Sequence, residues 1–158
     1  MDMQGAADRA DGMLSATVKA VVPEIQWTFD TTTTGSCDVT RYWTVMTVIS
    51  DQRRGNFLGV VERFWTQSDY KIKSVNRSKR TPAIYAVSPD GFGISLVFGD
   101  KGQAFFEVTS PCVSKSEVAP PKTLSNGPAY NDVDIPYPNV RSDFWSAETP
   151  VSSPAASP

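Results

Sequence analysis

Two cysteines, Cys37 and Cys112, are the residues of this chain whose chemistry is most open to interpretation. A thiol can act as a nucleophile, a metal ligand, a packed apolar group or half of a disulfide. The chain contains no histidine, so it lacks Cys-His and Ser-His catalytic pairs, mixed Cys/His zinc sites and a histidine pH switch. A free thiol and a disulfide are the two interpretations that remain open.

The positions of the cysteines favour the disulfide. Cys37 lies just before a long expected strand, and Cys112 lies just after the last expected strand. A bond between them would tie the two ends of a sheet across a long loop, and the chain-entropy estimate for closing such a loop is roughly 4 to 5 kcal/mol. Structural disulfides persist in oxidising compartments, so this pairing predicts a location outside the cytoplasm.

The acidic residues do not form a recognisable catalytic pair. A glycosidase needs two carboxyl groups at a defined separation, and nothing in the spacing of these acids pairs them. A glycine-rich phosphate loop is also absent, because the sequence GFG is not followed by a helix. We therefore expect a non-enzymatic protein without a cofactor or a metal ion. The acids considered are Asp38, Glu62, Asp90, Asp100 and Glu107.

Basic side chains concentrate in one region, the sequence RSKR and the strand before it. The cluster could bind an anionic partner, or it could be a solvated turn beside the wet face of a strand. The chain has 15 basic and 17 acidic residues and a formal charge of −2, which argues against a nucleic-acid partner. The possible partner-binding residues of this cluster are Lys71, Lys73, Arg77, Lys79 and Arg80.

The tryptophans could line a ligand cleft, but such residues more often fill a core. We expect Trp43 and Trp65 to be core residues. Trp145 lies outside the regular elements. It therefore either seals the domain or offers an anchor to a partner.

Two helices and about six strands must position these residues. Apolar spacing predicts helices over about 6–22 and 51–67, the second of them capped by Ser50 and Asp51. The alternating or β-branched stretches 25–29 and 39–49 predict strands, with TTTTGS as a polar connection. Four further short strands follow between Tyr70 and Thr109, with β-turns at SPDG and GDKG. The sequence therefore predicts an α+β fold, in which an antiparallel sheet of about five to six strands carries both helices on one face.

The composition changes after Cys112, where proline, serine and small polar residues become frequent. Such a segment cannot bury much apolar surface by itself, although its aromatic residues are unusual for a free tail. We expect a globular domain over residues 1–118, an extended segment over 119–145 packed partly on the domain, and a disordered tail over 146–158.

Several stretches resemble a family of small, uncharacterised actinobacterial (Streptomyces-like) extracytoplasmic lipoproteins. These are QGAADRADGML, PEIQWT, TTTGSCDVTR, TVISDQRRGNFLGVVERFW, GQAFFEVTSPCV and NVRSDFW. The resemblance implies an exported protein, anchored through a lipid on an N-terminal cysteine and displayed on the cell surface. The opening residues MDMQGAADRAD carry neither a signal nor that cysteine. Either the protein is cytosolic, or this sequence begins after a signal and an anchoring cysteine.

These observations lead to two main functional hypotheses; a third, an enzyme, would require a cleft with paired carboxylates of perturbed pKa. The first is a monomeric, extracytoplasmic, lipid-anchored domain that binds a protein or a cell-envelope component without catalysing a reaction. The second is an immunity- or inhibitor-type protein that blocks a secreted enzyme or toxin. The second hypothesis predicts a concentrated charged or aromatic patch on one face of the domain.

Overall fold

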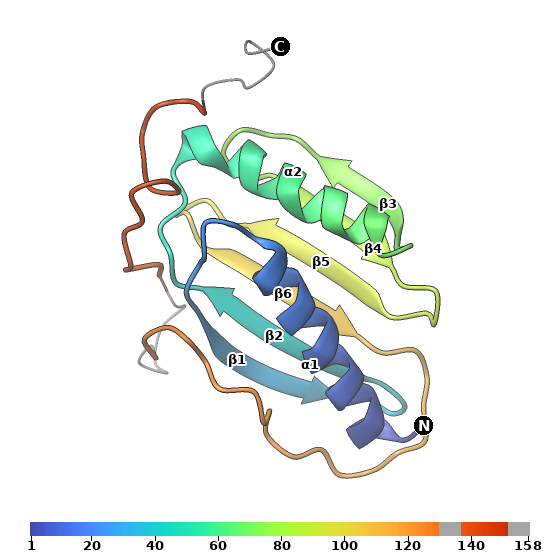
Figure 1. Ribbon diagram of the computed structural model, residues 1–158. Helices are drawn as coiled ribbons and strands as arrows, with labels where there is room; N and C mark the ends of the chain where they lie inside the picture. The colour runs from blue at the N-terminus through green and yellow to red at the C-terminus, as the bar shows by residue number, and fades with distance from the viewer. Residues whose placement is uncertain (130–136, 152–158) are drawn as a thin grey trace.

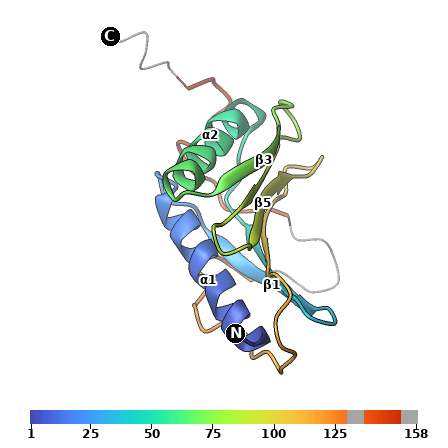
Figure 2. The same cartoon turned by 90° about the vertical axis from the view of Figure 1, so that its right-hand side faces the viewer.

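The computed structural model describes residues 1–129 and 137–151, and its two layers are a six-stranded antiparallel sheet and a pair of helices. The strand order is β1-β2-β6-β5-β4-β3, and both helices lie on the same face of the sheet (Figures 1 and 2). The predicted α+β fold is therefore confirmed. The elements in chain order are α1 (Met3–Ala20), β1 (Trp27–Thr34), β2 (Val39–Val45), α2 (Asp51–Gln67), β3 (Lys71–Asn76), β4 (Ala83–Val87), β5 (Gly93–Phe98) and β6 (Ala104–Thr109).

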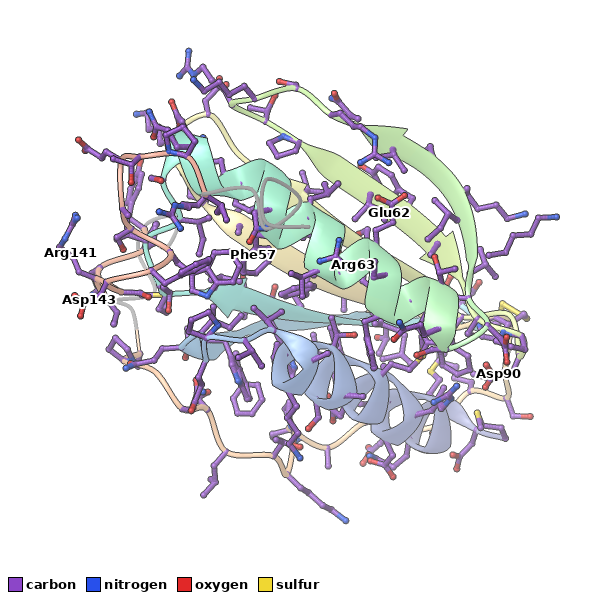
Figure 3. All side chains as sticks on the ribbon, turned by 45° about the horizontal axis from the view of Figure 1, so that its top comes forward. Phe57, Glu62, Arg63, Asp90, Arg141 and Asp143 are labelled. Carbon is purple, nitrogen blue, oxygen red and sulfur yellow. A yellow bond between two sulfur atoms is a disulfide. The ribbon has the colours of Figure 1, made fainter. Side chains whose placement is uncertain are left out.

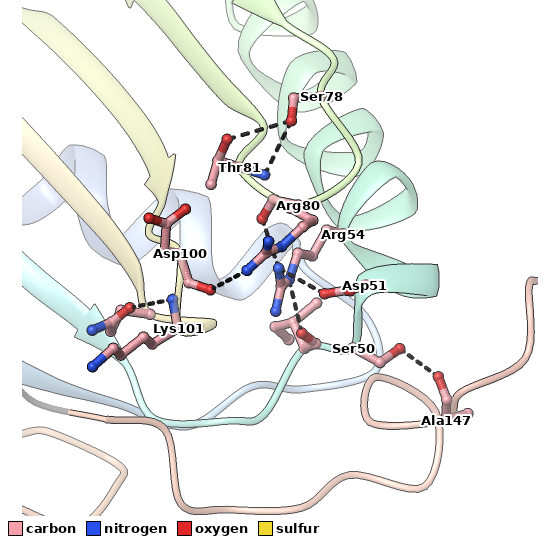
Figure 4. Close-up of polar contacts among 11 residues, drawn as sticks. Ser50, Asp51, Arg54, Ser78, Arg80, Thr81, Asp100, Lys101 and Ala147 are labelled. Carbon is pink, nitrogen blue, oxygen red and sulfur yellow. Dashed lines mark hydrogen bonds and ion pairs between the residues drawn. The ribbon is translucent and has the colours of Figure 1, made fainter.

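The first helix begins earlier than its apolar spacing predicts. The Gly5 N–H donates to the Asp2 side chain at 2.8 Å, which satisfies one of the free amide groups of the first turn. The second helix has the predicted bounds, but Ser50 does not cap it with its side chain. The Ser50 hydroxyl instead donates to the carbonyl of Ala147 (Figure 4). Asp51 lies in the first turn of α2 as expected.

Aromatic side chains form much of the core between the helices and the sheet. Trp27 and Trp43 stack with their ring centroids 3.7 Å apart. Phe57 of α2 contacts the rings of Phe98 and Phe106 edge-on or tilted, with centroids 5.8 Å and 6.3 Å away. Four of these side chains are each at most 2 % exposed, namely Trp43, Phe57, Phe98 and Phe106. Burial of their apolar area is therefore a main source of stability.

Each edge of the sheet is protected in a different way. At β1, the Trp27 N–H donates to the Asn126 side chain at 2.7 Å and the Gly127 N–H donates to the Trp27 carbonyl at 3.0 Å. A Cβ atom on Gly127 would lie 3.0 Å from the backbone of Trp27, so a larger residue here would push the two segments apart by a few tenths of an ångström. At β3, the exposed residues Lys71 and Lys73 and a bulge discourage pairing with another chain.

Two of the predicted strand boundaries are wrong. The sequence TTTT is not a connection, because β1 continues to Thr34 and pairs with β2 across an irregularity between Phe29 and Thr32. The strand predicted over 39–49 ends at Val45. Beyond it, the N–H groups of Asn139 and Val140 donate to the carbonyl of Met46, so the C-terminal segment takes the place of a neighbouring strand.

The predicted disulfide is confirmed. Cys37 and Cys112 are bonded, with their Cα atoms 4.8 Å apart and 75 positions apart in the chain. The Val113 N–H also donates to the Cys37 carbonyl, so the segment after β6 is fixed beside the start of β2. A disulfide of this kind suggests an oxidising, extracytoplasmic environment.

The C-terminal segment is tied to the start of α2. The Ser50 N–H donates to the Trp145 carbonyl at 3.0 Å, the Ser146 hydroxyl donates to the Val48 carbonyl at 2.6 Å, and Arg53 donates to the Thr149 carbonyl at 2.8 Å. The predicted start of a disordered tail at residue 146 is therefore too early, because these polar groups are paired with the domain. Residues 152–158 of that predicted tail, and residues 130–136 of the predicted extended segment, lie outside the described residues.

Candidate binding surface

The face of the sheet opposite the helices carries a row of side chains from four adjacent strands. The strand register places Tyr42 of β2, Glu107 of β6, Ser95 of β5 and Tyr85 of β4 directly opposite one another in that order. Because directly paired residues point to the same side of a sheet, the four form one line across it. We call Tyr42, Glu107, Ser95 and Tyr85 the central row.

A hollow of about 290 Å³ is lined by three residues of the central row, Tyr85, Ser95 and Glu107. Its floor is low because Ser95 and Gly93 are small, while Tyr85 stands 46 % exposed beside it. The bulge in β3 between Ile72 and Ser74 brings Lys73 to the lip of the hollow. Neither helix covers this side of the sheet (Figure 2).

Glu107 is the acidic group of this hollow. Partial burial raises the pKa of the Glu107 carboxyl, and a hydrogen bond from Thr109 opposes that shift only in part. Among residues 1–129 and 137–151, no lysine or arginine forms an ion pair with Glu107. A half-buried carboxylate without a cation is poorly compensated for the water it has lost.

A second depression runs between α1 and the segment that follows Cys112. Its wider part, about 540 Å³, is lined by apolar side chains that include Val18, Ile25 and Trp27, and by Leu124, which is 86 % exposed. An adjoining hollow of about 330 Å³ reaches Asp11. Apart from Asp11, the polar groups at its rim are Asp8, Ser15, Lys19, Glu24, Lys122, Thr123 and Asn126.

Asp11 forms a buried ion pair beneath this depression. Its Oδ1 lies 3.2 Å from Nε of Arg41, and the two side chains are 9 % and 2 % exposed. Arg41 also donates to the Thr32 hydroxyl at 2.8 Å and to the Ala119 carbonyl at 3.0 Å. The pair therefore joins α1, β1, β2 and the segment after Cys112, and its role is to hold these elements together.

The predicted basic cluster does not form one continuous surface. Arg77 pairs with Glu62 of α2 at 3.0 Å, and Figure 3 shows Glu62 on the side of α2 toward β3, whereas Arg63 points away from the sheet. Arg80 donates to the Asp100 carbonyl at 3.3 Å, and its own carbonyl accepts from Arg54 (Figure 4). Lys71, Lys73 and Lys79 are exposed, and Lys73 is the one that borders the hollow.

Trp145 is not a surface anchor. Its side chain is fully buried, with its ring centroid 5.1 Å from that of Phe57 and 4.8 Å from that of Phe144. Its Nε1 donates to the carbonyl of Pro23 at 2.7 Å. The partner-binding prediction for Trp145 is therefore wrong, and the alternative that it seals the domain is correct. The core predictions for Trp43 and Trp65 are confirmed, since both side chains are fully buried.

The five candidate acids lie on separate elements and in different surroundings. Asp90, in the turn before β5, pairs with Arg9 of α1 at 3.0 Å, and this contact and the Ser88 hydroxyl lower the pKa of Asp90 to about 2. Glu62 faces Arg77, as described above. Glu107 lies on the helix-free face of the sheet. Within the described part of the chain, no cluster of three or more acids and cysteines is arranged to hold a metal ion.

Sequence reasoning considered Glu107 but missed its neighbours. The tyrosines of the central row belong to β2 and β4, which are more than 40 positions apart in the chain. Alternation within each strand places Tyr42 and Tyr85 on opposite sides from Trp43 and Ile84. That pattern was available from the sequence, but the strand order that aligns the tyrosines with Glu107 was not.

Comparison with known proteins yields one structural neighbour. No family model matches the chain, and no curated protein sequence matches it. Among solved structures, the chain is similar to a DUF4853 family protein from Actinomyces odontolyticus, at 14% sequence identity and a TM-score of 0.40, over 89% of this chain and 78% of the other. Actinomyces is an actinobacterium. No residue role is carried over from this neighbour. In residues 1–129 and 137–151, neither helix has the length and apolar character needed to cross a bilayer.

Proposed function

We propose that this protein is a non-enzymatic, extracytoplasmic domain that binds a protein or a cell-envelope component through the helix-free face of its sheet. The observation that carries this proposal is the hollow at the central row. It combines a half-exposed aromatic ring, Tyr85, with the carboxylate of Glu107, which forms no ion pair within the described residues, on a surface that no helix covers. Tyrosine contributes large contact area at a low entropic cost, and for this reason it is enriched at binding interfaces.

Display outside the cell is part of the same proposal. The disulfide supports an oxidising compartment, and the resemblance to actinobacterial lipoproteins supports attachment to a membrane through a lipid. The test is mass spectrometry of the protein isolated from cells that express its complete gene. We expect an N-terminal peptide that begins with a lipid-modified cysteine. An unmodified N-terminus in a cytoplasmic fraction would contradict this part of the proposal.

Site-specific cross-linking tests the binding face. The photoreactive residue p-benzoylphenylalanine replaces Tyr85 in one variant and Arg63 in a matched control, because Arg63 is exposed on the helical side. We expect one adduct from the variant at Tyr85 and none from the control. The adduct's partner is then purified, and Ser95→Arg, which fills the hollow, must weaken its binding. Equal adducts from both positions, or unchanged binding by Ser95→Arg, would refute the proposed surface.

An immunity- or inhibitor-type role is the second candidate. It is favoured by the same concentration of aromatic and charged groups, because such residues at the centre of an interface contribute most of the binding energy. This role makes a further demand on the cross-linked partner, which must be an enzyme or toxin. We expect its activity to fall when the wild-type protein is added, and to be retained when Ser95→Arg is added.

A further inference from the structure

The chemistry of the hollow selects one type of side chain in the partner. Glu107 offers a carboxylate that no cation of the described chain neutralises, and Tyr85 offers an aromatic ring at the rim. Since adjacent strands lie about 4.8 Å apart, Tyr85 and Glu107, with Ser95 between them, are separated by roughly 10 Å across the sheet. A planar cation fits this spacing, because it can pair with the carboxylate while its face rests on the ring.

Resting on the proposed function, we propose that a partner protein inserts an arginine side chain into the hollow, where its guanidinium group pairs with Glu107 and packs against Tyr85. The volume of about 290 Å³ is at the lower end of the range for small-molecule pockets and suits a single side chain. The rest of the contact with the partner comes from the two cross-strand rows that flank the central row on the same face of the sheet. These rows contain Val87, Val97, Phe105 and Thr109.

The charges around the hollow set the orientation of the partner. Lys73 stands at the lip on the β3 side, and Lys71 lies on the same edge strand. A partner that is complementary to this face therefore has its arginine over Glu107 and acidic groups over the β3 edge. Burial raises the pKa of Glu107, and a bound cation would stabilise the ionised form that burial disfavours.

Small amide derivatives test this inference with the intact protein. The probes are N-acetyl-arginine amide and its neutral isostere N-acetyl-citrulline amide, which differ mainly in charge. Amide shifts in nuclear magnetic resonance spectra are followed during titration of each probe. We expect the arginine probe to shift the amide signals of Ser95 and Glu107, and these shifts to saturate as the probe concentration rises. The citrulline probe is expected to bind at least about tenfold more weakly, because charge-assisted hydrogen bonds are stronger than neutral ones.

Three variants connect the binding to its residues. Glu107→Gln keeps the size of the side chain and is expected to weaken the arginine probe about tenfold, whereas Glu62→Gln, on the other side of the sheet, is expected to leave it unchanged. Lys73→Ala removes a like charge from the lip and is expected to keep or increase the affinity. A probe that binds Glu107→Gln as well as wild type, or that is weakened by Lys73→Ala, would overturn the inference.

The cross-linking result separates this inference from the proposed function. If the arginine probe fails to bind but the position of Tyr85 still gives its specific adduct, the arginine inference is wrong and the binding face stands. If the probe binds at the hollow but cross-linking is equal at Tyr85 and Arg63, the chemistry of the hollow is correct and the proposed function is wrong.

Discussion

The buried ion pair between Asp11 and Arg41 gives the sharpest test of how this fold is held together. Both side chains are almost fully buried, with Nε and Oδ1 3.2 Å apart. Burial raises the pKa of Asp11 in spite of the opposing attraction of Arg41, so the pair does not fully compensate for the water that the carboxylate has lost. Removing one partner leaves the other as an uncompensated buried charge.

We expect Asp11→Ala to lower the free energy of unfolding by about 3 to 5 kcal/mol, the usual cost of breaking a buried pair. Arg41→Met is expected to cost at least as much, because it also removes the hydrogen bonds to Thr32 and Ala119, at about 1 kcal/mol each. The double variant leaves no buried charge. Its cost is therefore expected to fall short of the sum of the two single costs by at least about 2 kcal/mol.

Urea denaturation of the oxidised protein at neutral pH measures these values by linear extrapolation. The matched control is Asp8→Ala, which removes an exposed carboxylate from the same helix and is expected to change stability by no more than about 0.5 kcal/mol. Additive costs in the double variant, or a cost for Asp11→Ala as small as that of the control, would refute the reasoning.

Three further perturbations test other parts of the structure. Breaking the Cys37–Cys112 bond, by reduction or by double substitution to serine, is expected to lower the free energy of unfolding by about 4 to 5 kcal/mol, because the bond closes a loop over 75 positions. Equal urea midpoints with and without reductant would contradict this. Trp145→Ala is expected to cost about 3 to 5 kcal/mol in urea or thermal denaturation, because the side chain is fully buried, and a loss below about 1 kcal/mol would be inconsistent with that burial. The pKa of Asp90 is lowered to about 2 from its ordinary 3.8 by Arg9 and Ser88, so its ionised form stabilises the fold above about pH 4, and this contribution disappears as pH falls toward 2. Asp90→Asn should flatten the pH dependence of stability in that window, and an unchanged slope would exclude the ion pair as its cause.

Local periodicity explains which parts of the fold were predictable. The helix over 51–67 was predicted with its observed bounds, because its apolar residues follow a helical spacing and Ser50 and Asp51 suit a helix start. The disulfide was predicted from the positions of the cysteines, one before a long strand and one after the last strand. The sequence did not show that these two strands, β2 and β6, are neighbours. Where an element ends was not predictable when distant residues determine it. The end of β2 at Val45, four residues earlier than predicted, is an example, because the C-terminal segment bonds to the backbone beyond it.

The sequence by itself determined the class of fold and the exclusion of histidine chemistry, because these depend on composition and local spacing. It favoured the disulfide, and the structure established it. Only the tertiary structure decided that Arg41 faces the helices, that Trp145 is buried against Phe57, and that Tyr85 and Glu107 share one row. The physical reason is that alternation in a strand defines two faces without saying which one the helices cover. That choice, and the register between strands far apart in the chain, is made by long-range packing.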